Sequence, residues 1–169
     1  MNKRLLMLVG IAGSGKSTWA REYVKDQARQ GCHAIIASRD AIRFALLDEN
    51  DEYFAKENDV FKNYINNIQN SLADDDIDVV IADATHINKK SRAKVLKRLN
   101  LKDVIVEAVV FNTPVTRCLQ YNETRVGRER VPNVAIYSMR KNFTLPTNEE
   151  GFNTVNDAEA ILCRMKQMN

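Results

Sequence analysis

The sequence has few of the residues that would tie the protein to a structural metal, a disulfide framework or a membrane. Its 169 residues include three cysteines, which are far apart and form no CxxC pair. They indicate neither a zinc site nor a disulfide framework, and predict free thiols in a reducing compartment. No run approaches the ~20 apolar residues of a transmembrane helix. The apolar run Leu5–Val9 is too short for a signal peptide, so we expect a cytoplasmic protein with no membrane partner.

An excess of charge of one sign is also missing. The 25 basic and 22 acidic residues give a formal net charge of +3. This balance is too mild to predict nucleic-acid binding from bulk charge, so any polyanionic partner must be argued locally. A chain of this length is expected to form one domain, residues 1–169. Whether it forms a homo-oligomer is left open by the sequence.

Apolar runs of strand length alternate with longer segments of helical period. Strands are expected at residues 4–10, 33–38, 77–83, 104–112 and 151–155. Helices are expected at residues 16–30, 39–47, 53–72, 88–99, 114–125 and 133–143, and from residue 157 onward. This alternation predicts an α/β fold with a central parallel sheet of about five strands and helices on both faces.

One stretch carries the clearest chemical signal. Residues 10–17, GIAGSGKS, match the pattern G-x-x-x-x-G-K-[ST] in full, directly after an apolar strand and at the start of a helix. Backbone N–H groups of such a loop form an anion-binding nest at a helix N-terminus. Lys16 is expected to reach the β- and γ-phosphates of ATP, and the Ser17 hydroxyl to ligate Mg²⁺. The predicted nucleotide-binding residues are Gly13, Ser14, Gly15, Lys16, Ser17 and Thr18.

A phosphotransferase also needs a base for the acceptor hydroxyl, and Asp40 is the candidate. It follows the second expected strand, and ligands in open α/β sheets bind outside the carboxyl ends of the strands. Asp40 is interpreted either as a general base or as the N-cap of the next helix. Arg43 lies three residues further along the same helical face, where it can clamp an acceptor phosphate.

Asp83, which closes a fully apolar strand, is the candidate for a carboxylate near the Mg²⁺ ion. This is the Walker B position, where the carboxylate holds Mg²⁺ or its waters. Asp83 is alternatively interpreted as orienting Ser17 or an acceptor group, or as a turn residue. His86, in the same loop, is predicted to be a hydrogen-bonding residue rather than a catalyst.

The basic segment 125–132 supplies candidate arginines for the transferred phosphoryl group. Arg125, Arg128 and Arg130 flank Gly127, an arrangement that predicts a mobile lid over the phosphates. The alternative is a solvated basic loop. No guanine-specificity motif NKxD is present, so the nucleobase is not determined by a motif.

Several stretches together resemble the 5′-hydroxyl polynucleotide kinases, namely the P-loop kinase domains of bacteriophage polynucleotide kinase-phosphatase and of the bacterial RNA-repair kinase. They are GSGKSTWARE, SRDAIR, DATHIN, FNTP…CLQYNETRVGR and EGF, in the family's order. The resemblance implies a P-loop kinase fold with an arginine-bearing lid, and it implies that Asp40 acts as general base on a 5′-hydroxyl. It further implies Arg43 on the adjacent acceptor phosphate, Asp83 as a support in the site, and Arg125 and Arg128 as lid arginines.

The sequence departs from that family's pattern in two ways. Tyr121 stands where the pattern often has arginine, and no D-x-D-G-T motif is present. The resemblance therefore implies no phosphatase domain and no 3′-phosphatase activity.

The helix expected after Asp83 carries six basic residues and no acidic one: Lys89, Lys90, Arg92, Lys94, Lys97 and Arg98. A solvated helix face is the favoured interpretation, and a track for a phosphate backbone is the alternative.

The sequence as a whole predicts an ATP- and Mg²⁺-dependent kinase that phosphorylates a 5′-hydroxyl end of DNA or RNA, with the choice between the two and the range of donors left open. One alternative is a P-loop kinase of a sugar, nucleoside or metabolite. Another is a nucleotide-binding regulatory NTPase.

Overall fold

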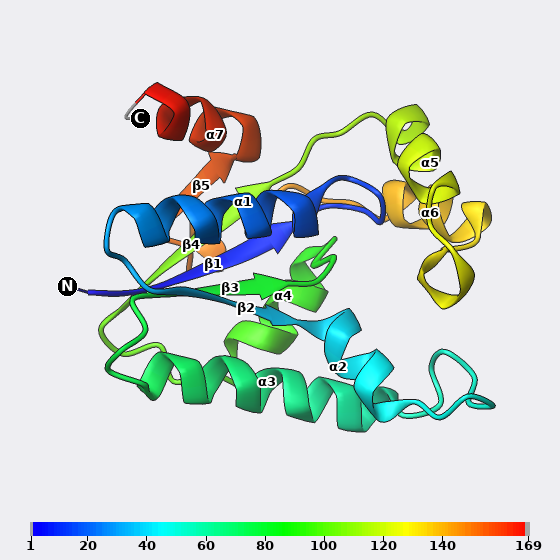
Figure 1. Ribbon diagram of the computed structural model, residues 1–169, viewed down its shortest axis with the longest axis horizontal. Coiled ribbons are helices and arrows are strands. Elements are labelled where there is room, and N and C mark those ends of the chain that lie inside the picture. Colours follow the sequence, from blue (N-terminus) through cyan, green and yellow to red (C-terminus); the bar gives the residue numbers. More distant parts are fainter. Residues whose placement is uncertain (1, 168–169) are drawn as a thin grey trace.

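A five-stranded parallel sheet forms the centre of the computed structural model, which describes residues 2–167 (Figure 1). The strands are β1 (Lys3–Val9), β2 (Ala34–Ser38), β3 (Val79–Asp83), β4 (Val104–Val110) and β5 (Thr154–Asp157). Their order across the sheet is β2-β3-β1-β4-β5, and every neighbouring pair is parallel. The expected α/β fold with a five-stranded parallel sheet is confirmed.

Helices cover both faces of the sheet. They are α1 (Lys16–Arg29), α2 (Arg39–Leu46), α3 (Glu57–Ala73), α4 (Lys89–Leu96), α5 (Val115–Glu123), α6 (Asn133–Lys141) and α7 (Ala158–Gln167), with 3₁₀ turns η1 (Gly127–Glu129) and η2 (Asn148–Glu150). Helices α1 and α7 pack on one face, and α3 and α4 pack on the other. Helices α2, α5 and α6 lie beyond the carboxyl ends of the strands (Figure 1). Within residues 2–167, no helix has the length and apolarity needed to cross a membrane.

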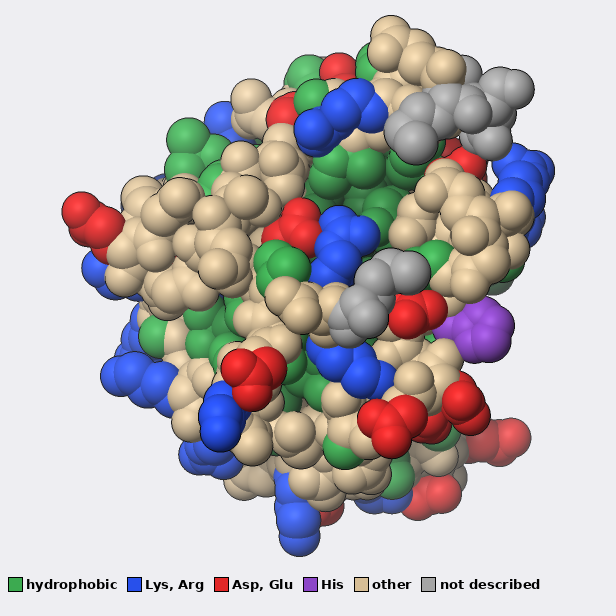
Figure 2. Space-filling view, turned by 90° about the vertical axis from the view of Figure 1, so that its left-hand side faces the viewer, with side chains coloured by type: hydrophobic (Ala, Val, Ile, Leu, Met, Phe, Trp, Pro, Cys, Tyr) green, Lys and Arg blue, Asp and Glu red, His purple; other side chains and the backbone are tan. Residues whose placement is uncertain are grey.

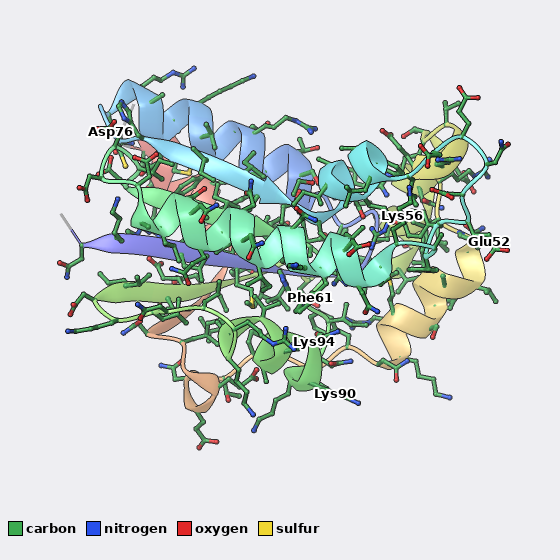
Figure 3. All side chains as sticks on the ribbon, turned by 90° about the horizontal axis from the view of Figure 1, so that it is seen from below. Glu52, Lys56, Phe61, Asp76, Lys90 and Lys94 are labelled. Atoms are coloured by element: carbon green, nitrogen blue, oxygen red, sulfur yellow. The ribbon has the colours of Figure 1, made fainter. Side chains whose placement is uncertain are left out.

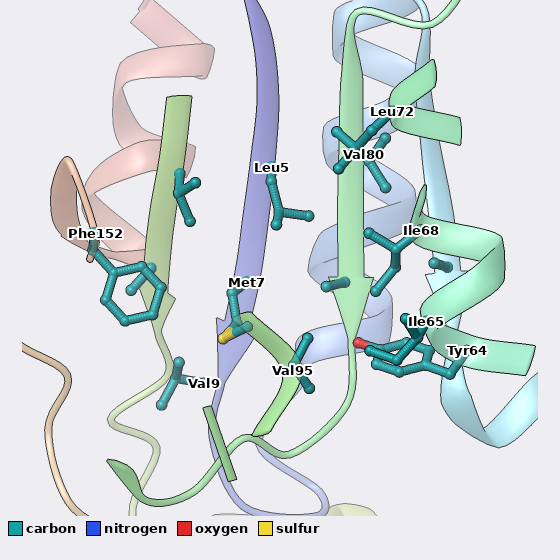
Figure 4. Packing of buried hydrophobic residues seen from close by; sticks show 14 of the residues in the cluster. Leu5, Met7, Val9, Tyr64, Ile65, Ile68, Leu72, Val80, Val95 and Phe152 are labelled. Carbon is teal, nitrogen blue, oxygen red and sulfur yellow. The ribbon is translucent and has the colours of Figure 1, made fainter. Parts of the chain in front are cut away.

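Strand β1 is buried on both sides, which explains its unbroken apolar sequence. Leu5, Met7 and Val9 point to the face covered by α3 and α4 (Figure 4). Leu6 and Leu8 point to the face covered by α1 and α7. Side chains alternate between faces with a period of two, so a strand covered on both faces needs apolar residues at every position.

The helix expected at residues 53–72 begins later than predicted, at Glu57. The preceding residues instead form a loop that folds back against α2, where the Tyr53 hydroxyl donates a hydrogen bond to Asp40 (3.0 Å). The residues that carry the helical period, from Phe61 to Leu72, all lie within α3, and the pattern does not extend to residues 53–56.

The register of the sheet determines what meets at its carboxyl edge. Met7 pairs with Ala82 across β1 and β3, and Ser38 pairs with Asp83 across β2 and β3. The loop after β1, the loop after β3 and the start of α2 therefore leave the sheet side by side. This edge is the place where α/β sheets bind their ligands.

The core between the sheet and α3 makes a prediction about stability. Ile68 is fully buried in this core, whereas its neighbour Asn67 is exposed. Ile68→Ala is expected to lower the free energy of unfolding by about 2–5 kcal/mol, because it leaves a cavity between the helix and the sheet. Asn67→Ala, on the same helix, should change it by less than about 0.5 kcal/mol. Denaturant unfolding of the two variants measures the difference, and equal values would contradict this packing.

Candidate functional site

The glycine-rich loop between β1 and α1 has the backbone that an anion-binding loop requires. Gly13 and Gly15 have φ angles of 76° and 91°, in the left-handed region that favours glycine. A Cβ on Gly13 would lie 2.3 Å from the carbonyl oxygen of Cys118 in α5, so a side chain there is also excluded sterically. Helix α1 starts at Lys16, and its free N–H groups therefore open onto this loop.

Lys16 is buried beneath the loop. Its Nζ donates hydrogen bonds to the carbonyl oxygen of Ile11 (2.7 Å) and to Ser14 Oγ (3.3 Å). Burial lowers the pKa of Lys16 to about 8; the charge of Asp83 opposes this shift, and the charge of Arg125 adds to it. The ammonium group is therefore held at the phosphate loop by neutral partners, a carbonyl and a hydroxyl oxygen, which a phosphate can replace.

Ser17 and Asp83 meet as the strand register requires. Ser17 Oγ donates a hydrogen bond to Asp83 Oδ2 at 2.8 Å, so the structure shows Asp83 orienting Ser17. Burial raises the pKa of Asp83, while the Ser17 hydrogen bond and the charge of Lys16 oppose this rise. Thr18 follows Ser17 in the first turn of α1 and is exposed.

The donor set fits a magnesium ion that arrives with a nucleotide. A hydroxyl and a carboxylate are oxygen ligands, and Mg²⁺ commonly takes one or two protein carboxylates with the rest supplied by phosphates and water. In the described part of the chain, no three His, Cys, Asp or Glu side chains gather into a metal site. Ser17 and Asp83 are therefore the residues that would hold this ion, with substrate oxygens completing its coordination.

Asp40 lies in the first turn of α2 and not at its N-cap. The cap is Ser38, whose Oγ accepts a hydrogen bond from the backbone N–H of Ala41 (3.2 Å), so the capping interpretation of Asp40 is wrong. The Asp40 side chain is 64% exposed. Its Oδ1 accepts hydrogen bonds from Arg43 Nη1 (2.5 Å) and from the Tyr53 hydroxyl (3.0 Å). Its Oδ2 has no hydrogen-bond partner among residues 2–167.

Arg43 is buried and faces three side chains. Besides Asp40, its Nη1 contacts the Tyr53 hydroxyl (3.0 Å) and its Nη2 donates to Glu57 Oε2 (2.7 Å). The guanidinium carbon lies 4.4 Å from the centre of the Tyr53 ring. Burial, together with the charge of Asp40, raises the pKa of Tyr53 to about 12, so its hydroxyl remains a donor at neutral pH. Arg43 therefore holds Asp40 in place in this structure.

Tyr53 and Glu57 are site residues that the sequence analysis missed. Glu57 is ion-paired with both Arg39 and Arg43. Burial raises the pKa of Glu57, but the two arginines outweigh this effect and the net shift is downward. No local pattern links these residues to Asp40, because the loop between α2 and α3 brings them together.

The two predicted lid arginines lie in different places. Arg128 Nη2 donates to the carbonyl oxygens of Asp48 (2.9 Å) and Glu49, on the loop between α2 and α3. Arg125 Nη1 donates to the carbonyl oxygen of Glu129 (3.4 Å), and its charge acts on Lys16. Arg128 therefore contacts the loop between α2 and α3 rather than the phosphate loop. Tyr121 is half-exposed at the end of α5.

His86 is a buried hydrogen-bonding residue that ties three elements together. One ring nitrogen, Nδ1, contacts the carbonyl oxygen of Leu8 in β1 (2.8 Å), and Nε2 contacts the Tyr64 hydroxyl in α3 (3.2 Å). A carbonyl oxygen only accepts, so Nδ1 carries the proton and Nε2 accepts from Tyr64. Burial lowers the pKa of His86 to about 4, which keeps the ring neutral.

Arg92 corrects the interpretation of the basic helix as an entirely solvated face. Its side chain is fully buried and forms a bidentate ion pair with Glu150, at 2.7 and 2.8 Å. Its Nη1 donates to the carbonyl oxygens of His86 (3.1 Å) and Thr144 (2.9 Å). The spacing of Arg92 with Val95, Leu96 and Leu99 is that of one helix face, which could have predicted this burial.

The neutral state of His86 predicts a loss of stability in acid. The folded pKa of about 4 lies below the unfolded value of 6.5, so the unfolded chain binds the proton more strongly. Stability from this group is present above pH 6.5 and is lost as the pH falls toward 4. Between pH 7 and pH 5, the wild type should lose about 2 kcal/mol more than His86→Asn, measured by denaturant unfolding. The same pH dependence in both proteins would contradict a buried neutral histidine.

Comparison with known proteins identifies the family. A family model described as an AAA domain matches residues 5–146. The L-seryl-tRNA(Sec) kinase of Methanococcus maripaludis is 26% identical over 144 residues, which are 84% of this chain and 53% of that protein. The chain thus spans about half the length of this curated relative.

Solved structures show the same fold. A chain of the Pnkp1/Rnl/Hen1 RNA repair complex matches with a TM-score of 0.68 and 22% identity, over 83% of this chain and 44% of that chain. The APS kinase CysC of Mycobacterium tuberculosis, in complex with AMPPNP and APS, matches with a TM-score of 0.61 and 15% identity over 98% of both chains. The chain therefore belongs to the AAA domain family and has the α/β fold of P-loop kinases.

Proposed function

We propose that this protein is an ATP- and Mg²⁺-dependent kinase that transfers the γ-phosphoryl group to a 5′-hydroxyl end of DNA or RNA. The observation that carries the proposal is the placement of Asp40 at the same sheet edge as Lys16, Ser17 and Asp83. One oxygen of Asp40 is anchored by Arg43 and its other oxygen is free. A triphosphate site beside an oriented, accessible carboxylate is what phosphoryl transfer to a hydroxyl requires.

The donor half of the site binds the triphosphate. Lys16 exchanges its contacts with Ile11 and Ser14 for phosphate oxygens, and the N–H groups of the loop and of α1 surround the same phosphates. Ser17 and Asp83 hold the magnesium ion, which when bound neutralises charge on the phosphates. The residues proposed to bind nucleotide are those of the predicted loop, Gly13 to Thr18.

The acceptor half deprotonates the hydroxyl. Asp40 Oδ2 accepts the proton, while Arg43 and Tyr53 hold Oδ1 and so orient the carboxylate. Arg43 has also been predicted to bind the acceptor's adjacent phosphate. Its Nη atoms face Asp40, Tyr53 and Glu57, but its buried Nε has no hydrogen-bond partner within residues 2–167, so Arg43 keeps an N–H donor beyond these three contacts.

The segment 125–132 closes the site in this proposal. The charge of Arg125 acts on Lys16, which supports Arg125 as the arginine that approaches the transferred group. Arg128 must leave the carbonyl oxygens of Asp48 and Glu49 before it can reach a phosphate. Such arginines neutralise charge on the phosphoryl group in the transition state. Residues 1–169 are proposed to act as one P-loop kinase domain with this lid.

A nucleic-acid acceptor is supported by the polynucleotide-kinase-like stretches around Asp40 and Arg125, and by the similarity to a kinase named for a tRNA substrate. A second candidate acceptor is the hydroxyl of a small molecule. It is favoured by four acidic residues on the loop beside Asp40, which repel a polyanion: Asp48, Glu49, Asp51 and Glu52.

The general-base assignment is tested with Asp40→Asn. Its amide cannot accept the hydroxyl proton, so kcat on a 5′-hydroxyl oligonucleotide should fall by about 10²- to 10⁴-fold. The matched control is Asp75→Asn, which makes the same chemical change on an exposed turn before β3. Transfer of label from γ-labelled ATP measures both. Near-normal turnover of Asp40→Asn would remove the assignment.

The lowered pKa of Lys16 predicts how nucleotide binding responds to pH. Only the protonated ammonium attracts phosphate, and above its pKa of about 8 the free lysine must take up a proton in order to bind. The affinity for ADP, measured by calorimetry, should therefore fall about tenfold between pH 7 and pH 9. Lys16→Arg keeps its charge over this range and should show a flatter profile. A flat wild-type profile would contradict the role of Lys16.

A further inference from the structure

Three basic side chains form a row along one side of α4. Lys90 and Lys94 are four residues apart on the helix, and Arg98 follows at the same interval in the turn after it. Residues at this spacing lie above one another on a helix surface. All three are exposed, and we refer to them as the α4 stripe. Figure 3 shows Lys90 and Lys94 on the side of α4 that faces Phe61 of α3.

The α4 stripe is connected to the candidate acceptor site through Phe61. Lys94 Nζ lies 4.3 Å from the centre of the Phe61 ring, and the Arg98 guanidinium carbon lies 5.7 Å from it. The third cation on this ring is Arg39, at 5.5 Å. Arg39 directly precedes Asp40 and is ion-paired with Glu57, so a chain of contacts runs from the proposed base through Arg39 and Phe61 to α4.

The α4 stripe lacks the carboxylate partners that several basic residues near the site have. Arg39 is paired with Glu57, Lys56 with Asp48 and Asp51, and Arg92 with Glu150. Within residues 2–167, no carboxylate forms an ion pair with any member of the stripe. Figure 2 shows the end of the molecule where the strands begin, which carries both basic and acidic side chains. Lys94 and Arg98, which lie on one ring without a carboxylate partner, are complementary to a polyanion.

We infer that the α4 stripe binds phosphodiester groups of a single-stranded acceptor beyond its 5′-terminal nucleotide. The inference rests on the proposed function, because it requires the acceptor to be a nucleic acid. The acidic loop at residues 48–52 borders the site on the α2 side, and it repels the strand from there. The strand therefore leaves Asp40 by way of Arg39 and Phe61 and lies along α4. Its binding releases counterions, so the contribution of the stripe depends on salt.

The test compares two double variants that remove the same charge. Lys94→Gln with Arg98→Gln removes two of the three charges of the stripe and keeps most of each aliphatic stem. Lys25→Gln with Arg29→Gln is the matched control, because these exposed residues have the same spacing on α1, across the sheet. The first measurement is the binding of a 5′-hydroxyl single strand of about 12 nucleotides by fluorescence anisotropy, between about 50 and 200 mM salt. The second is the KM for that strand and for a 5′-hydroxyl dinucleotide.

Loss of two phosphate contacts should reduce the slope of log affinity against log salt by about 1.4, since each contact to a single strand contributes about 0.7. In the control variant the KM of the longer strand should stay below that of the dinucleotide. In the stripe variant this difference in KM should shrink. If the stripe variant and the control variant have equal salt slopes, the inference is overturned. It is also overturned if polyglutamate displaces the labelled strand from the wild type as strongly as unlabelled nucleic acid does.

The failure of this inference is distinguishable from failure of the proposed function. If the wild-type protein phosphorylates the dinucleotide and the longer strand with equal KM, only the inference about the α4 stripe is overturned. Wild-type protein that phosphorylates a small molecule and no oligonucleotide overturns both.

Discussion

The parallel pairing of β1 with β3 is the constraint on which the candidate site depends. Gly10 follows β1 and donates its backbone N–H to the carbonyl oxygen of Thr85, which follows β3 (3.0 Å). The two loops therefore leave the sheet joined, and Ser17 meets Asp83 at 2.8 Å. A shift of one residue in this register would turn every side chain of β3 to the opposite face. The burial of β3 on both faces and its pairing with two strands oppose such a shift.

Around this pairing, buried polar side chains hold the surrounding elements in place. His86 joins β1 to α3, and Arg92 joins the His86 loop to the segment that carries Glu150. Each polar group in this network has a partner, and a satisfied network in a low-dielectric interior favours one arrangement over others. Asp83 lies three residues from His86, so the network also supports the end of β3, where Asp83 lies.

The acceptor side is built differently, from contacts at the surface. Asp40 is exposed, and its orientation comes from Arg43 and Tyr53 rather than from burial. The loop that supplies Tyr53 is also the loop that Arg128 contacts. If Arg128 leaves this loop to bind phosphate, the loop loses a contact. In this account, that loss affects the position of Asp40, because the same loop carries Tyr53.

Features encoded by local sequence patterns were predictable. Strands β1 to β4 follow from apolar runs, and the phosphate loop follows from glycines placed before Lys16. Strand β5 has one apolar residue and overlaps the strand expected at residues 151–155 only in part. Features that depend on long-range contacts were not predictable in the same way. Nothing near Asp40 in the sequence indicates Tyr53. The burial of Arg92 follows from its spacing on α4, but its ion pair with Glu150, 58 residues away, does not. The placement of Arg128 depends on a contact with residues 79 and 80 positions away.

The most direct measurement of the central claim is to identify the labelled product. Protein is incubated with γ-labelled ATP, Mg²⁺ and an equimolar mixture of 5′-hydroxyl RNA, 5′-hydroxyl DNA, a nucleoside and a sugar. The account predicts label on an oligonucleotide, recovered in its 5′-terminal nucleotide after nuclease digestion. Label in the nucleoside or sugar alone, or release of labelled phosphate with no acceptor labelled, would contradict it.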